Sequence, residues 1–508
     1  MPRKAGLAFA IVFLNWRYQA VKSYQKFLVP FSTLFVLLVC GSAIGQMDNR
    51  SFGHPILPAP VDPQIQAAIH KISPQRIQQD ITTLVGFHNR STLSSNDTDL
   101  PKGQGVLAAA DWIEAQFRAY SAACGGCLEV KRDTFTQQPG SRVKQPTAID
   151  NIYAVLRGSD PAQASRMYLV TGHYDSRDSS NDDTHGFAPG ANDDASGVAV
   201  SLESARVLSK LHFPATLVFV AVAGEEQGLY GSRHLAEFAK QQGWNLEGVL
   251  NNDIVGGNTT PGDKLQNKNV VRVFSEGIPA TASEQQIRMV RMLGGESDSP
   301  SRELAREIVG VDRTYFKAGA AGLNAETFHP VMEFRLDRYL RGGDHYSFNL
   351  AGFPAVRFTE WREDFHHQHQ NVRVEDGTQY GDLLQFVDFH YVAHVAQLNA
   401  ATLATMASAP GTPVNARIIA QKLDNNTELA WDAPTGAPAN TTYQIVWRDT
   451  AAPDWQFYDS VGSATRVTVP VSKDNVIFGV RSVDPAGHRS PAAFPFPARF
   501  RTPPLSKK

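Results

Sequence analysis

Two adjacent carboxylates, Glu225 and Glu226, follow an apolar, β-branched run at residues 216–222. The run is typical of a buried strand, and Gly224 interrupts it just before the two acids. The ends of strands are where an open α/β sheet carries its chemistry. An isolated pair of acids is more often a solvated turn, so a catalytic interpretation requires matching groups elsewhere in the chain.

Four other segments bring groups that can bind a metal. Two follow strand-like runs, one precedes a helix-like pattern, and one is a late histidine cluster. They contribute His173 and Asp175 in GHYDS, Asp193 and Asp194 in PGANDDASG, Asp253 in NND, and His366, His367 and His369 in HHQH. Singly, these residues could be hydrogen-bonded histidines and helix N-caps. Together they form the ligand chemistry of two zinc ions, which one bridging carboxylate would hold about 3.5 to 4 Å apart.

The order of these motifs, with AGEEQGLYGS in the middle, resembles the secreted dizinc aminopeptidase family, which includes bacterial leucyl aminopeptidases and the glutamate carboxypeptidase group. The resemblance covers residues 151–403. It implies an α/β fold with a mixed, mostly parallel sheet flanked by helices, and two zinc ions per chain.

The resemblance also implies a role for each residue. The ligands are His173 and Asp253 for one zinc, Glu226 and His367 for the other, and Asp193 as the bridge. Glu225 is the expected general base, which accepts a proton from the attacking water. Asp175 is expected to orient His173.

The last ligand departs from the family pattern. A Tyr often precedes this His, and an Asp follows it four positions later, whereas here His366 precedes His367 and the later position is Asn371. The spacing favours His367, with His366 and His369 as alternatives. If His367 is the ligand, we expect His366 to donate to the developing oxyanion in place of the Tyr.

Other segments must position these groups. Helix-like spacing of apolar residues at 65–87 and 106–120 predicts helices that pack on the sheet. Residues 258–337 have few strand signals, and the resemblance implies that they line the substrate pocket.

The N-terminus has the layout of a signal peptide. Lys22 and Lys26 precede the apolar run FLVPFSTLFVLLV, and a stretch of small residues ends at Gly45. We predict a signal peptide at 1–45 with cleavage before Gln46, and hence a secreted or periplasmic protein without stable membrane insertion. Cys124 and Cys127 would then be the only cysteines left, and we expect them to form a local disulfide.

A change of character after residue 408 predicts a second domain. We expect the zinc exopeptidase domain at 46–408, a β-sandwich at 409–500 and a tail at 501–508. Short alternating strands around Trp431 resemble a fibronectin type III module. Such a module binds partners or serves as a spacer, and its partner is unknown.

Composition narrows the function further. The 48 Lys and Arg nearly balance the 50 Asp and Glu among 508 residues, which gives no sign of nucleic-acid binding.

We predict an aminopeptidase that acts on peptides with a free N-terminus. The alternatives are a carboxypeptidase with a cationic pocket, for which Arg233, Arg341 and Arg357 are candidates, a one-zinc glutaminyl cyclase, and a non-catalytic binding or adhesion protein.

Overall fold

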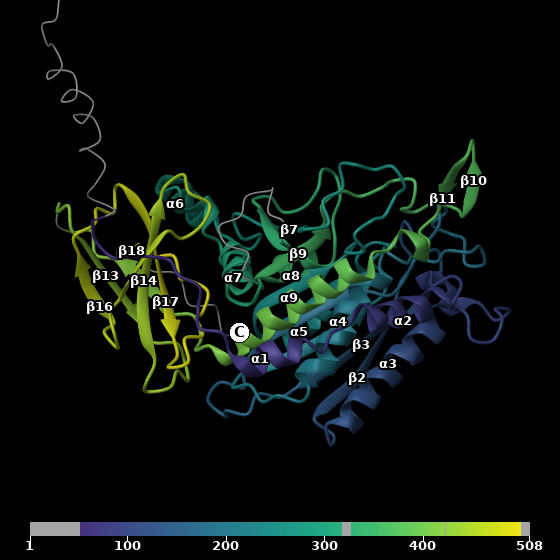
Figure 1. Cartoon of the computed structure of the whole chain (residues 1–508), viewed down its shortest axis with the longest axis horizontal. Coiled ribbons are helices and arrows are strands. Elements are labelled where there is room, and N and C mark those ends of the chain that lie inside the picture. Colours follow the sequence, from purple (N-terminus) through teal and green to yellow (C-terminus); the bar gives the residue numbers. More distant parts are fainter. Residues whose placement is uncertain (1–50, 317–326, 422, 499–508) are drawn as a thin grey trace, which may run out of the picture. The chain divides into compact units, whose positions relative to one another are not determined.

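The computed structural model describes residues 51–316, 327–421 and 423–498. Its main structural element is an eight-stranded mixed sheet (Figure 1). The four neighbouring strands β5, β4, β6 and β9 are parallel, and antiparallel pairs occur toward both ends. The predicted mixed, mostly parallel sheet is therefore confirmed. In spatial order the strands are β2 (Leu128–Gln137), β3 (Thr147–Leu156), β5 (Thr216–Val222), β4 (Arg166–His173), β6 (Asn245–Asn252), β9 (Ala355–Glu360), β7 (Val270–Ser275) and β8 (His329–Glu333).

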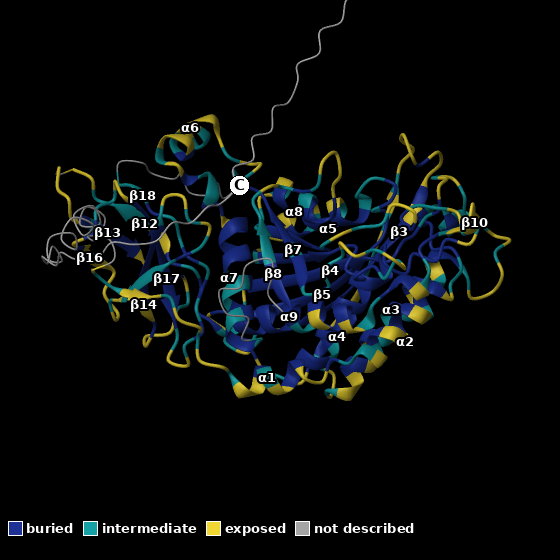
Figure 2. Ribbon diagram, turned by 45° about the horizontal axis from the view of Figure 1, so that its top comes forward, coloured by how far each residue is buried: buried dark blue, intermediate teal, exposed yellow. Residues whose placement is uncertain are grey.

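Helices cover both faces of this sheet. One apolar core joins it to α3, α4 and α9, and a second joins its other face to α5 and α8. The central strands and α9 are largely buried, as the dark blue ribbons of Figure 2 show. The helices are α1 (Pro63–Ile69), α2 (Pro74–Val85), α3 (Gly105–Ala123), α4 (Ala195–Leu208), α5 (Tyr230–Gln241), α6 (Glu284–Leu293), α7 (Pro300–Tyr315), α8 (His345–Ala351) and α9 (Phe389–Ser408).

The three central strands end at the same edge of the sheet. His173, the last residue of β4, lies opposite Val222, the last residue of β5. Asp253 directly follows β6, the other neighbour of β4. After β5 the chain turns at Gly224, whose positive φ of 78° is readily adopted by glycine. These parallel strand ends therefore place the motif residues side by side.

The helices before the sheet agree in part with the sequence pattern. The predicted helix at 106–120 is α3. The pattern at 65–87 forms two helices, because Ser73 caps α2 and Pro74 occupies its first turn. The sequence of residues 258–337 shows few strand signals, but the described part of this interval contains the strands β7 and β8 and the helices α6 and α7.

Residues near the C-terminus form two four-stranded sheets, ordered β16-β13-β12-β18 and β1-β15-β14-β17. The predicted C-terminal all-β part is confirmed, and Trp431 is buried in the apolar core that the two sheets share. Strand β1 comes from the start of the described chain. The strands are β1 (His54–Pro55), β12 (Val414–Ile418), β13 (Thr427–Asp432), β14 (Thr442–Asp449), β15 (Phe457–Ser460), β16 (Arg466–Val469), β17 (Val476–Val483) and β18 (Phe496–Pro497).

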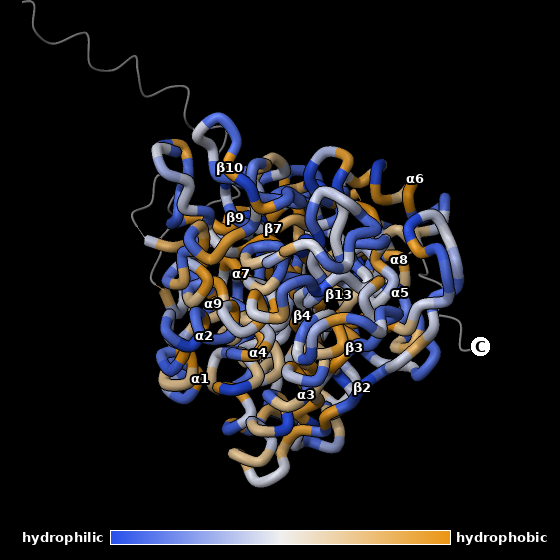
Figure 3. Tube along the Cα trace, turned by 90° about the vertical axis from the view of Figure 1, so that its right-hand side faces the viewer, coloured by the Kyte–Doolittle hydropathy of each residue, from blue (hydrophilic) through white to orange (hydrophobic). Residues whose placement is uncertain are grey.

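A disulfide and a short hairpin lie outside the two sheet systems described above. Cys124 and Cys127 form the expected disulfide. The hairpin β10 (Arg373–Glu375) and β11 (Thr378–Tyr380) lies among mainly hydrophilic peripheral loops in Figure 3. Among the described residues, no helix has the length and apolar character needed to span a membrane. The predicted signal peptide lies outside these residues.

Candidate metal centre

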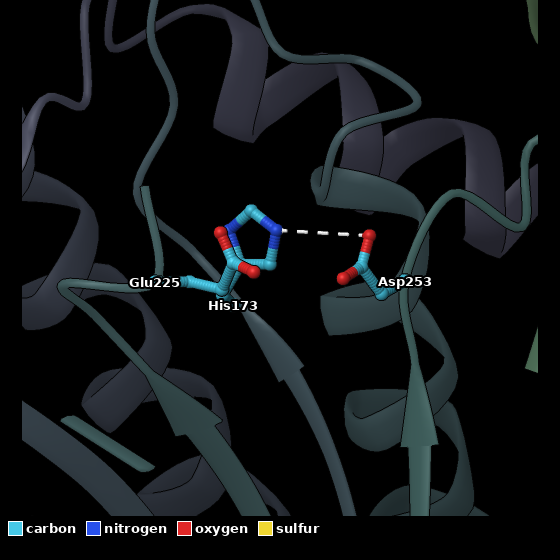
Figure 4. Close-up of side chains that lie close together, drawn as sticks. All are labelled: His173, Glu225 and Asp253. Atoms are coloured by element: carbon cyan, nitrogen blue, oxygen red, sulfur yellow. Dashed lines mark ion pairs between the residues drawn. The ribbon is translucent and has the colours of Figure 1, made fainter. Parts of the chain in front are cut away.

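The first candidate ligand group consists of His173, Glu225 and Asp253, which come from three neighbouring strand ends (Figure 4). One potential ligand atom from each lies within 4.8 Å of the others. His173 Nε2 is 3.9 Å from Asp253 Oδ1. His173 and Asp253 are buried, whereas Glu225 is half-buried. The structure therefore brings these three predicted residues together.

A second group consists of Asp193, Glu226 and His369. The Nε2 atom of His369 is 3.0 Å from Asp193 Oδ2 and 3.1 Å from Glu226 Oε2. The other carboxylate oxygen of Asp193 is 3.1 Å from Nε2 of His173, in the first group. Asp193 thus touches both groups, as a bridging carboxylate must.

His367 does not lie where the sequence placed it. Its Nδ1 atom is 3.0 Å from the side-chain oxygen of Asn258, and its ring stacks on Phe386 with centroids 3.6 Å apart. In contrast to the buried His367, His366 is exposed, and its Nδ1 atom lies 3.2 Å from the carboxylate of Asp364. His369, which sequence analysis kept as an alternative, is the histidine beside Asp193.

Asp175 connects the two motifs that carry His173 and Glu226. Its backbone carbonyl is 3.1 Å from Nδ1 of His173, which leaves Nε2 facing the carboxylates. Its carboxylate accepts hydrogen bonds from the backbone N–H of Glu226 at 3.1 Å and from the hydroxyl of Thr92 at 3.0 Å. Asp175 is therefore placed to orient His173, mainly through its carbonyl group.

The loop that carries Asp193 is held by two further carboxylates. Asp194 caps α4 by accepting from the N–H of Gly197 at 2.9 Å, and it also accepts from the N–H of His173 at 3.0 Å. Asp382 accepts from the backbone N–H of Asp193 at 2.7 Å. The N-cap role considered for Asp194 agrees with the structure, whereas no sequence motif marked Asp382.

Two arginines beside the groups were not assigned to the centre from the sequence. The guanidinium of Arg357 is fully buried and lies 2.8 Å from Asp253 and 3.2 Å from Asp337. The guanidinium of Arg177 lies 3.2 Å from Glu226 and 2.9 Å from Nδ1 of His369. The sequence predicts Arg357 only as a candidate for a cationic pocket, and no motif singles out Arg177.

Burial and charge set the proton affinities in the centre. Burial raises the pKa of Glu225 well above its usual range, and the carboxylates of Asp253 and Glu226 raise it further against the opposing effect of His173. Burial lowers the pKa of His369, but Glu226 and Asp193 outweigh it and raise the pKa to about 10. Glu225 is thus a carboxylate with enhanced affinity for a proton.

The chemistry of both groups fits zinc. Each combines imidazole nitrogen with carboxylate oxygen, the donors that zinc accepts. Glu226 Oε1 is buried and forms no hydrogen bond within the described residues, and His173 Nε2 faces the carboxylates of Asp193 and Asp253. A cation between these atoms would satisfy them, so His173, Asp253, Asp193, Glu226 and His369 can together hold zinc.

Comparisons with known proteins agree with this chemistry. The sequence profile of peptidase family M28 matches residues 151–303. A protein of Pyrenophora teres f. teres named "Probable zinc metalloprotease" is 44% identical over 462 residues, which cover 90% of this chain and 92% of that protein. One of Leptosphaeria maculans with the same description is 45% identical over 443 residues, covering 87% and 99%.

Two solved structures show more distant similarity. The Legionella pneumophila LapA aminopeptidase is 20% identical with a TM-score of 0.46, covering 70% of this chain and 77% of that chain. The glutaminyl cyclase of Macrostomum lignano is 19% identical with a TM-score of 0.47, covering 69% and 94%.

Proposed function

We propose that this chain, a zinc metallopeptidase that belongs to peptidase family M28, is an exported aminopeptidase that uses two zinc ions to remove N-terminal residues from peptides. The observation that carries the proposal is the position of Asp193, whose two carboxylate oxygens face different candidate ligand groups at 3.1 and 3.0 Å. A carboxylate so placed suits a pair of ions.

Glu225 and Asp175 have different roles in the proposed peptide hydrolysis. Zinc, when bound, supplies a Lewis acid that polarises the scissile carbonyl and makes water more acidic. Glu225 would accept the proton of the attacking water, because its carboxylate lies beside His173 and Asp253 and its side chain is only half-buried. Glu225 then returns the proton to the departing amine. Asp175 keeps the ring of His173 in a single orientation.

The placement of Arg357 favours an aminopeptidase over a carboxypeptidase. Its buried guanidinium pairs with Asp253 at 2.8 Å and with Asp337 at 3.2 Å, so it does not form an open pocket for a substrate carboxylate.

Export is supported by the signal-like N-terminus and by the Cys124–Cys127 disulfide, since disulfides persist mainly in oxidising compartments.

The test combines metal content with substrate choice. We expect about two zinc ions per purified chain and cleavage of leucine p-nitroanilide but not of its N-acetyl derivative. One zinc with cyclisation of an N-terminal Gln would indicate a glutaminyl cyclase instead. Cleavage of the N-acetylated substrate would contradict a requirement for the free amine.

A further inference from the structure

We infer that three exposed side chains, Tyr339, Leu340 and Phe365, form a surface that binds apolar side chains of the peptide beyond the scissile bond. Substrates of four or more residues with apolar third and fourth residues should then be preferred over dipeptides. This inference rests on the proposed aminopeptidase function and deepens it by naming a substrate class. We call these three side chains the apolar rim.

The apolar rim presents large apolar side chains to solvent. Tyr339 is 80% exposed, Phe365 is 63% exposed and Leu340 is fully exposed. Single exposed apolar residues are common, but a group of them often marks a binding surface. Leu340 is unfavourable in a second way, because its backbone has a φ of 55°, which is uncommon for residues other than glycine and asparagine. Strain of this kind is concentrated at functional sites.

The two loops that carry the apolar rim contact each other. Arg338 on the first loop is 2.5 Å from the carboxylate of Glu363 on the second. Arg341, directly after Leu340, lies over the ring of Phe365, with its guanidinium carbon 5.9 Å from the ring centroid. These contacts bring Leu340 and Phe365 to the same part of the surface.

Both loops adjoin the candidate metal centre. The first loop continues to Gly343, where an added Cβ atom would come 3.2 Å from Oδ2 of Asp253. Leu340 is three residues before Gly343 and so lies within about 11 Å of it. Phe365 is four residues before His369 on the second loop and so lies within about 14 Å of that candidate ligand. The apolar rim is therefore a few residues' length of extended peptide from both ligand groups.

The geometry of an exopeptidase decides which part of the substrate reaches the rim. An aminopeptidase holds the first residue of its substrate at the metal centre, where the side chains of His173 and Asp253 are only 1% and 4% exposed. The part that extends outward to the exposed rim is then the chain after the scissile bond. Because an extended peptide spans about 3.3 to 3.6 Å per residue, its third and fourth residues come within reach of the rim.

Three substrates with the same scissile bond test the preference. Leu-Ala-Leu-Phe-amide has apolar third and fourth residues, Leu-Ala-Ser-Asn-amide has polar ones, and Leu-Ala-amide has none. From initial rates of leucine release by the zinc-loaded enzyme, we expect kcat/KM for the first to exceed the others about five- to thirtyfold, the range for partial burial of one or two apolar side chains. The gain should lie mainly in KM, because groups remote from the reacting bond bind substrate and transition state alike.

Leu340→Asn is the most informative variant, because asparagine tolerates a positive φ and lacks the apolar side chain. It should remove most of the preference without lowering the free energy of unfolding or the zinc content, both of which a merely structural role would lower. Phe365→Ser should act in the same direction. Met292→Asn, which removes a 71% exposed apolar side chain from α6, is the matched control and should keep the preference.

The outcomes separate this inference from the proposed function. Equal kcat/KM for all three substrates would overturn the inference and leave the aminopeptidase intact, whereas release of leucine from none of them would count against both. The inference is also wrong if Leu340→Asn and Phe365→Ser keep the preference, or if Met292→Asn loses it to the same extent. If the wild type dimerises in solution and Leu340→Asn does not, the rim binds a second copy of the chain instead.

Discussion

The two candidate ligand groups are held by different kinds of structure. His173 and Asp253 project from adjacent parallel strands, and Arg357 beneath them has no solvent exposure. In the second group, His369 comes from an irregular segment, its side chain is 26% exposed, and its neighbour Arg177 also reaches solvent. The strand-end group is therefore preorganised by the core, whereas the second group depends on a loop for His369.

This difference has consequences for stability and for specificity. Strands buried on both faces hold their end residues with little freedom, which suits the groups that perform the chemistry. Loops vary and move more readily, and they often carry the residues that select a ligand. We expect changes at the strand-end group to affect catalysis and folding, and changes at the loop group to affect metal occupancy and substrate choice.

The largest effect expected concerns the two adjacent glutamates. Glu225→Gln keeps the shape of the side chain but cannot accept a proton, so kcat should fall about 100- to 10,000-fold. Glu226→Gln should instead lower the zinc content, because Glu226 belongs to the second group. Steady-state kinetics and metal analysis of both variants distinguish the roles. Near-normal turnover of zinc-loaded Glu225→Gln would show that Glu225 is not the base.

The next largest effect concerns Arg357, the buried cation beside the strand-end group. Burial raises the pKa of Asp337, but Arg357 and His345 lower it below the usual range. A depressed pKa stabilises the folded chain at pH values above about 4, and this contribution is lost as the pH falls. Arg357→Met leaves Asp253 and Asp337 without their buried partner, which should cost about 3 to 5 kcal/mol of unfolding free energy.

Arg177→Met is the matched control at the loop group. Because Arg177 keeps some contact with solvent, its loss should cost less than the loss of Arg357, about 1 to 3 kcal/mol for leaving the carboxylate of Glu226 without its partner. Urea unfolding of the two variants at neutral pH compares them directly. Equal destabilisation would contradict the contrast between a core-held and a loop-held group.

A smaller effect separates two histidines of the loop. His369→Ala should weaken zinc binding by more than the roughly 10- to 100-fold loss typical of residues that only support the ligands, because it removes a ligand itself. His367→Ala should keep the zinc and lose only the packing on Phe386 and the contact with Asn258. Zinc retention during dialysis against a chelator measures both. Loss of zinc in His367→Ala alone would restore the original assignment of that residue.

The same contrast explains what could be predicted from the sequence. Strand β5 was predicted residue for residue, because an uninterrupted apolar and β-branched run has few other solutions. The motif order also indicated that His173, Asp193, Glu225, Glu226 and Asp253 lie together. Parallel strands bring their ends to one edge of the sheet, so motif order along the chain is informative there.

The loop could not be predicted in this way. The choice of His367 relied on a spacing of four residues, but His369 has a left-handed backbone with φ of 50°, and such local turns break simple spacing rules. Arg177 and Arg357 were missed as neighbours of the centre because their partners are 49 to 192 residues away in sequence or lie on other strands. No local pattern encodes such contacts.

The smallest effect expected is that of His366, which sequence analysis considered as a donor to the oxyanion. Its side chain is 57% exposed and pairs with Asp364, and its ring meets the edge of Tyr380. Because it is exposed and belongs to neither ligand group, His366→Ala should change kcat/KM by less than about twofold, as is usual for surface substitutions. Kinetics on leucine p-nitroanilide, with zinc content measured in parallel, tests this. A loss above about tenfold with zinc retained would mean that the loop moves His366 into the centre during turnover, and the loop group would then supply chemistry as well as selection.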